Sequence, residues 1–334
     1  MPQATLRRVR RGATAALLAG CLASVLALSG CTDDESGPES TPGPSTETTA
    51  PAYDPALEPA AGVLALVPDA ATRLAVTDFD QIRLQLGNPD LSPSAPPRER
   101  AEFWARVDNE TAALTAGLLR ADEDVLREEY GFTQDDVLWE AQFGDESGAT
   151  GWVLKFRDDL DMTGVQRAVD EEVGPLAGAK VAVEERVIGT GTTSTPEQSW
   201  AADPDLTALV GRPAAATYVE RSCIAFDDVF GEGVLEQLAS APSEDVAELT
   251  ELTAFAVSFG GDLATAWLGP ARGDTFPRSR LAETLPETDP SFAAGFQHPV
   301  ADPAGGRIGY ALGDPRLAVE LTMTRRLPFA VCAP

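Results

Sequence analysis

Two apolar runs decide the fold of this 334-residue chain: Val137-Leu138-Trp139-Glu140-Ala141-Gln142-Phe143 and Thr150-Gly151-Trp152-Val153-Leu154-Lys155-Phe156. Both are rich in aliphatic and aromatic residues, and the glycine-bounded residues 144–148 between them suit a tight loop, so the pair predicts a β-hairpin. A helical pattern follows over residues 162–173, and residues 180–188 return as a strand. This β-β-α-β order predicts an α+β fold, with a mixed or antiparallel sheet and helices on one face.

The remainder of the chain alternates in a similar way. Helices are expected at residues 80–86, 97–120, 122–130, 233–239, 278–285 and 314–325, and strands at residues 73–79, 217–219, 254–259, 263–268 and 307–312. No internal repeat stands out, and no linker after Ala61 is clean enough to mark a domain boundary. We therefore expect one continuous folded region over residues 61–334 and leave a two-lobed arrangement open.

Composition excludes several functional classes. The chain has 53 Asp and Glu against 25 Lys and Arg, a formal net charge of -28, one His and four Cys. Such an acidic chain repels phosphate backbones, so we expect no nucleic-acid partner. With His298 as its single imidazole, the chain cannot build a His-rich zinc site or a Ser-His-Asp triad away from that residue, and it has no Gly-x-Ser-x-Gly elbow. We expect no cofactor and find no catalytic signature.

Residues 1–30 have the layout of an export signal. Four arginines between Arg7 and Arg11 precede an uncharged stretch from Gly12 to Gly30. The stretch ends in Leu28-Ser29-Gly30-Cys31, which resembles the lipobox of bacterial cell-envelope lipoproteins of the high-GC Gram-positive type. This resemblance is confined to the start of the chain. It implies cleavage before Cys31 and attachment of diacylglycerol to its thiol; an uncleaved membrane-spanning helix over residues 12–30 is the alternative.

A second match, Leu18-Ala19-Gly20-Cys21, competes for the same role. Use of Cys21 would start the exported chain with the apolar run 22–28, whereas use of Cys31 gives the polar start Thr32-Asp33-Asp34-Glu35, so we favour Cys31. Residues 31–60 then form a lipidated start and a Ser/Thr/Pro/Glu-rich stalk with too few apolar side chains to order itself. We place the α+β ectodomain at residues 61–334.

The resemblance also bears on the remaining cysteines. If Cys21 leaves with the signal and Cys31 carries lipid, Cys223 and Cys332 are left in an oxidising compartment. An even number of thiols there predicts one disulfide between them. Two separately buried thiols are the alternative.

Three local patterns are candidate sites. Asp159, Asp161, Thr163 and Asp170 have the spacing of calcium ligands in an EF-hand loop, although Asp161 equally suits the N-cap of the following helix. Residues 189–194 lack the third glycine of a dinucleotide loop and predict a plain loop. Trp200 lies in a polar loop, where an aromatic side chain can contact a partner.

These features lead to three functional hypotheses. The first is a lipid-anchored protein on the extracytoplasmic side of the cell membrane that acts by binding, as a scaffold, sensor or carrier of an envelope lipid, peptide or protein. The second is the solute-binding lipoprotein of an ABC importer. The third is a carboxylate-dependent hydrolase, which stays open because no pair among the 53 acids stands out.

Overall fold

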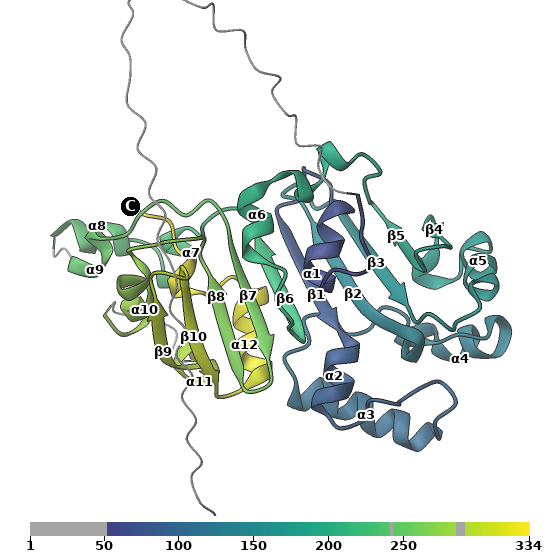
Figure 1. The fold of residues 1–334 in the computed structure, drawn as a ribbon. Coiled ribbons are helices and arrows are strands. Elements are labelled where there is room, and N and C mark those ends of the chain that lie inside the picture. The colour runs from purple at the N-terminus through teal and green to yellow at the C-terminus, as the bar shows by residue number, and fades with distance from the viewer. Residues whose placement is uncertain (1–51, 241–242, 285–290) are drawn as a thin grey trace, which may run out of the picture. The chain divides into compact units, whose positions relative to one another are not determined.

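A ten-stranded antiparallel sheet organises the computed structural model, which describes residues 52–240, 243–284 and 291–334. The strand order is β4-β5-β3-β2-β1-β6-β7-β8-β10-β9 (Figure 1). The strands are β1 (Arg73–Asp78), β2 (Val137–Gly144), β3 (Thr150–Phe156), β4 (Lys180–Ala182), β5 (Val187–Thr190), β6 (Ala216–Glu220), β7 (Phe255–Gly260), β8 (Leu263–Trp267), β9 (Phe296–Asp302) and β10 (Arg307–Leu312). The predicted α+β class with an antiparallel sheet is confirmed.

Short helices connect the strands. They are α1 (Pro59–Gly62), α2 (Phe79–Gln85), α3 (Pro97–Glu110), α4 (Glu123–Val125), α5 (Met162–Asp170), α6 (Pro204–Leu209), α7 (Phe226–Phe230), α8 (Val234–Ser240), α9 (Glu244–Ala247), α10 (Thr275–Thr284), α11 (Ser291–Gly295) and α12 (Pro315–Met323). Aspartates cap several of them: Asp78 accepts from Gln81 N at 3.0 Å, and Asp314 accepts from Arg316 N at 3.0 Å. Within the described ranges, no helix has the length and apolarity needed to cross a bilayer.

Helices cover both faces of the sheet, which corrects the expectation of helices on one face. Leu74 and Val76 of β1 pack with α1 and α6 on one face, and Ala75 between them packs with α12 on the other. Figure 1 shows α1 in front of the sheet and α12 behind it. We call these the α1 face and the α12 face. Because central strands are buried on both sides, their sequences lack the strict alternation that a one-sided sheet would impose.

The two halves of the sheet repeat one topology. Counted outward from the centre, the first half runs β1, β2, β3, β5, β4, and the second half runs β6, β7, β8, β10, β9. The two first strands, β1 and β6, pair antiparallel, with Ala75 opposite Tyr218. A short sequence echo accompanies this repeat: Phe79-Asp80-Gln81-Ile82 opens the helix after β1, and Phe226-Asp227-Asp228-Val229 opens the helix after β6. The two halves nevertheless share one continuous sheet.

Several element boundaries differ from the sequence expectations. The helix expected over residues 97–120 ends at Glu110, because the N–H groups of Leu114 and Thr115 bond to Thr77 Oγ1 of β1, at 3.1 and 2.9 Å, and not to a helical carbonyl. The expected strand 180–188 is a hairpin of β4 and β5. The folded part also begins before residue 61, since α1 starts at Pro59 and Tyr53 packs on the α1-face core.

The C-terminal segment is fastened to the end of β6. Cys223 and Cys332 form the predicted disulfide, with their Cα atoms 4.8 Å apart across a sequence separation of 109 residues. Beside it, Ile224 N donates to Ala330 O and Cys332 N donates to Ile224 O, both at 2.9 Å. The last residues of the chain are thereby part of the core.

Candidate binding site

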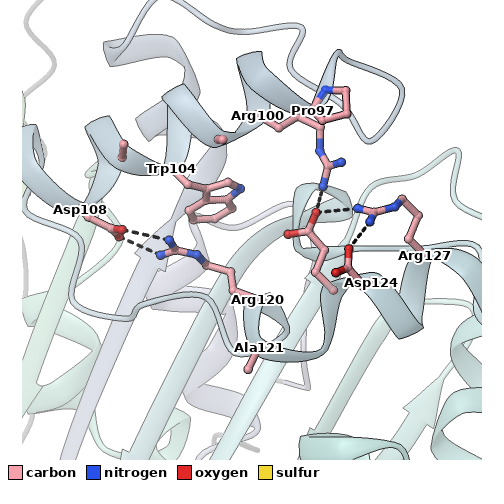
Figure 2. A pocket seen from close by; sticks show the side chains of 11 residues that line it. Pro97, Arg100, Trp104, Asp108, Arg120, Ala121, Asp124 and Arg127 are labelled. Carbon is pink, nitrogen blue, oxygen red and sulfur yellow. Dashed lines mark hydrogen bonds and ion pairs between the residues drawn. The ribbon is translucent and has the colours of Figure 1, made fainter.

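A hollow with a volume of about 540 Å³ lies between α3 and residues 120–127 (Figure 2). Three arginines line it, and each meets a carboxylate. Arg120 forms a two-pronged ion pair with Asp108, at 2.8 and 2.9 Å, and its guanidinium lies 4.6 Å from the centre of the Trp104 ring. Arg100 and Arg127 both contact Glu123.

These ion pairs brace α3 against the chain beneath it. Asp135 is almost fully buried, and its two carboxylate oxygens accept from Trp104 Nε1, at 2.8 Å, and from Arg100 Nε. A buried carboxylate is stable only when its oxygens are satisfied in this way. Because every cation of this hollow is already neutralised, the hollow offers little to a charged ligand, and we assign it a structural role.

Another hollow is a groove of about 460 Å³ on the α12 face of the first half, and we call it the sheet groove. Two cross-strand rows form its floor. In one, Arg73 of β1 lies beside Gly144 of β2, which lies beside Thr150 of β3. In the other, the order is Tyr218, Ala75, Gln142 and Trp152. Gly144 and Ala75 leave the floor low beside Arg73 and Tyr218, whereas the exposed Gln142 side chain lies between Ala75 and Trp152.

The third row of the same face is closed off by residues 114–118. Glu140 of β2 lies in this row, fully buried, and accepts from Leu118 N and from Gln142 Nε2, both at 2.8 Å. Burial raises the pKa of the Glu140 carboxyl, and these hydrogen bonds oppose the shift. Leu118 forms one rim of the groove, and Met323, at the end of α12, forms the other.

One wall of the groove carries an excess of positive charge. The buried carboxylate of Glu220 accepts from the Tyr218 hydroxyl at 2.7 Å and pairs with Arg325 Nε at 2.7 Å. Burial raises the pKa of Glu220, while Tyr218, Arg325 and nearby Arg73 lower it. Glu220 is thus committed to Arg325. Arg73 and Arg325 thus lie near one carboxylate, which pairs with Arg325 alone, in a chain whose net charge is -28.

Arg73 is the exposed arginine of that wall. Within residues 52–240, 243–284 and 291–334, the side chain of every other arginine makes a hydrogen bond, ion pair or ring contact, whereas that of Arg73 makes none. Its side chain extends across Gly144, since a methyl group on that glycine would lie 3.6 Å from Arg73 Nε. The guanidinium consequently lies over the groove floor with its donors unused.

Two further carboxyls have raised pKa values and serve as caps. Burial raises the pKa of Asp78 to about 6, against the opposing hydrogen bond from Gln81 N. Burial also raises the pKa of Asp136 to about 6, against a hydrogen bond from Thr133 N and the charge of Arg157. Each holds the end of a helical turn at the sheet, and neither lines the sheet groove.

The calcium candidates are engaged in other contacts. Asp159 pairs with Arg157, Asp161 caps α5 by accepting from Thr163 N at 3.0 Å, and Asp170 accepts from Gln166 Nε2 at 2.9 Å. Because α5 begins at Met162, most of the proposed loop is helix. In the part of the chain that the structure describes, no cluster of three or more acidic, His or Cys side chains is arranged to hold a metal ion.

The other residues singled out from the sequence lie apart. Trp200 is fully buried, and its Nε1 donates to Ala71 O at 3.1 Å, so the interpretation of an exposed contact residue is wrong. His298 is exposed on β9. Cys21 and Cys31 lie outside the described residues.

Sequence reasoning missed the sheet groove. Its floor comes from β1, β2, β3 and β6, and the adjacency of β1 to β6 joins segments that no local pattern connects. Trp152 is half-buried at the groove edge. The chain matches no protein-family model, no curated protein and no solved structure.

Proposed function

We propose that this chain is a lipid-anchored extracytoplasmic protein that acts by binding a ligand in the sheet groove. The observation that carries the binding role is the groove itself. A volume of about 460 Å³ lies within the range of small-molecule sites, and both an unpaired guanidinium and a half-buried indole face it. The guanidinium can bind an anion, and the indole can bind an apolar group.

The proposed location comes from the sequence. The Leu28-Ser29-Gly30-Cys31 motif after a basic start supports lipidation of Cys31, and the acidic remainder provides no electrostatic route to a membrane. The Cys223–Cys332 disulfide in the folded part is compatible with export, because such bonds persist in oxidising compartments.

The two alternatives receive less support. A solute receptor of an ABC importer requires two α/β lobes, whereas this chain has one antiparallel sheet shared by both halves. A carboxylate-dependent hydrolase requires two acids on an open site. The buried acids near the groove, Glu140 and Glu220, are both held by hydrogen bonds or an ion pair, and neither is a lining residue.

Two experiments test the proposal. Metabolic labelling with an alkyne fatty acid should tag the wild-type chain and the Cys21→Ala variant, and should fail for Cys31→Ala; labelling of Cys31→Ala would refute the lipid anchor at Cys31.

For the binding role, native mass spectrometry of chain purified from its own envelope should detect a bound molecule. Thr150→Trp, which fills the groove from an exposed floor position, should lose it. Retention of that molecule by Thr150→Trp would place binding elsewhere.

A further inference from the structure

We propose that the ligand of the sheet groove is an organic anion, whose carboxylate or phosphate group pairs with Arg73 and whose apolar body lies against Trp152. The inference rests on the proposed function, because it assumes that the groove is a binding site. It adds the chemical class of the ligand and the residue that recognises it.

The charge of the groove wall supports an anion. Most cations of this acidic protein are neutralised by carboxylates, including all three arginines of the α3 hollow. Next to the sheet groove, Glu220 already pairs with Arg325 at 2.7 Å, so it does not pair with Arg73 as well. A guanidinium held over a concave floor, with its fork of donors free, matches the geometry of a carboxylate or phosphate.

The floor supports an apolar body attached to that anion. From Arg73 the floor runs across Gly144 and Ala75, which leave room, and past the exposed Gln142 of β2 to Trp152 on β3. Met323, which is 44% exposed, and Leu118 form the rims. An anion without an apolar part would leave these groups in water, and burying such surfaces is the main source of affinity in small-molecule sites.

The groove also has a physical reason to stay open. In the second half of the sheet, the chain after β10 continues as α12 and covers the α12 face. In the first half, the chain after β5 continues to α6, which packs on the α1 face. The first half therefore has no helix after β5 on the α12 face, and its floor residues remain accessible.

The test uses two probes that differ only in charge: naphthylacetate and its neutral amide, naphthylacetamide. The full chain is held in phosphatidylcholine nanodiscs, with empty nanodiscs as blank, and equilibrium dialysis measures binding. Wild type should bind naphthylacetate more tightly than the amide. Arg73→Gln should lose about tenfold in naphthylacetate affinity and keep its affinity for the amide. Equal naphthylacetate affinity in wild type and Arg73→Gln would overturn the proposal.

Two control variants separate the possible failures. Arg98→Gln removes one positive charge from an arginine whose side chain is 90% exposed on α3, and it should leave both affinities unchanged. A loss of naphthylacetate affinity in Arg98→Gln equal to that of Arg73→Gln would reduce the effect to net charge and overturn the assignment.

Thr150→Trp should abolish binding of both probes. If it has no effect on either, the groove is not the binding site and the proposed function fails. If it blocks binding while Arg73→Gln changes nothing, only the inference about the anion fails.

A competition arm identifies the source of the anion. Dissolved naphthyl phosphate should displace naphthylacetate from the wild-type chain, and its failure to do so would remove phosphates from the proposed class. Phosphatidylglycerol added to the nanodiscs should displace the probe if a lipid headgroup is the ligand, and should not if the ligand is a dissolved anion. Circular dichroism of Arg73→Gln should match wild type, because the Arg73 side chain makes no hydrogen bond or ion pair within the described residues.

Discussion

Arg278 of α10 donates a hydrogen bond from Nη1 to the carbonyl oxygen of Val331 at 2.7 Å. The same nitrogen reaches Phe329 O at 2.9 Å, while Nε bonds to Asp274 Oδ2 at 2.8 Å. The Arg278 side chain is completely buried. A buried charge therefore holds the C-terminal segment to α10, next to the disulfide that holds it to β6.

Replacement of Arg278 by Met should destabilise the protein by about 3 to 5 kcal/mol. The variant leaves the buried carbonyl oxygens of Phe329 and Val331 without this hydrogen-bond donor and removes one partner of Asp274. Urea unfolding followed by circular dichroism measures the change. Arg98→Met, on the exposed face of α3, should stay within about 0.5 kcal/mol of wild type. Similar values for the two variants would contradict the role assigned to Arg278.

Removal of the Cys223–Cys332 disulfide tests the second contact that holds the C-terminal segment in place. The Cys223→Ala/Cys332→Ala double variant should lose about 4 kcal/mol, since the bond closes a long loop in the unfolded chain. The tail should keep its place, because the Ile224 hydrogen bonds to Ala330 and Cys332 are independent of the sulfurs. Hydrogen exchange at those amides should stay slower than in an unfolded peptide; free exchange there would show that the disulfide alone holds the tail.

Asp78 should make stability depend on pH. Its pKa is about 6 in the folded protein against 3.8 without the fold, so the folded state binds this proton more tightly and gains stability as pH falls from 7 toward 4. Asp78→Asn keeps an acceptor for Gln81 N and removes the buried charge. At pH 7.5 this variant should be more stable than wild type by roughly 2 kcal/mol.

The same comparison at pH 4 provides the control. There the Asp78 carboxyl is mostly protonated in the folded state, so the advantage of Asp78→Asn should shrink markedly. Thermal melts of both proteins across this range measure the difference. A constant difference at all pH values would show that the substitution acts through packing and not through the charge.

Trp200 should behave as a core residue. Trp200→Ala should cost about 3 to 5 kcal/mol, because it empties a fully buried position between the α1 region and α6. Trp200→Phe should cost less but still destabilise, since Ala71 O loses the indole N–H. Chemical denaturation ranks the variants, and a neutral Trp200→Ala would restore the interpretation of Trp200 as a contact residue.

Local features of the fold were predictable from sequence. The hairpin of β2 and β3 follows from its apolar runs and glycine loop, and the helix that opens on Asp314-Pro315 follows from capping preferences. Features that depend on distant partners were not. Helix α3 ends early because Thr77, far away in sequence, takes the N–H groups of Leu114 and Thr115, and a helical pattern contains no sign of that competition.

The groove was unpredictable for the same reason. Arg73 has no local feature that sets it apart from the other arginines; its lack of partners depends on Glu220 being committed to Arg325. The repeat left one readable signal, the Phe-Asp pairs at Phe79-Asp80 and Phe226-Asp227, but two residues are too short a match to establish a repeat. In contrast, the cysteine pairing could be predicted, because the expected export signal accounts for Cys21 and Cys31 and leaves only two cysteines.

The repeated topology also has a consequence for the independence of the two halves. Either half alone would present β1 or β6 as a bare central edge, with its backbone hydrogen-bonding groups unpaired along the strand. Two equivalent strands that pair antiparallel about their midpoint have the geometry of a symmetric dimer interface. The two halves therefore pair through β1 and β6 as the two subunits of a symmetric dimer would, within one polypeptide. That covalent link allows α12 to cover this face of one half while the sheet groove stays open in the other, an asymmetry that two identical subunits could not maintain.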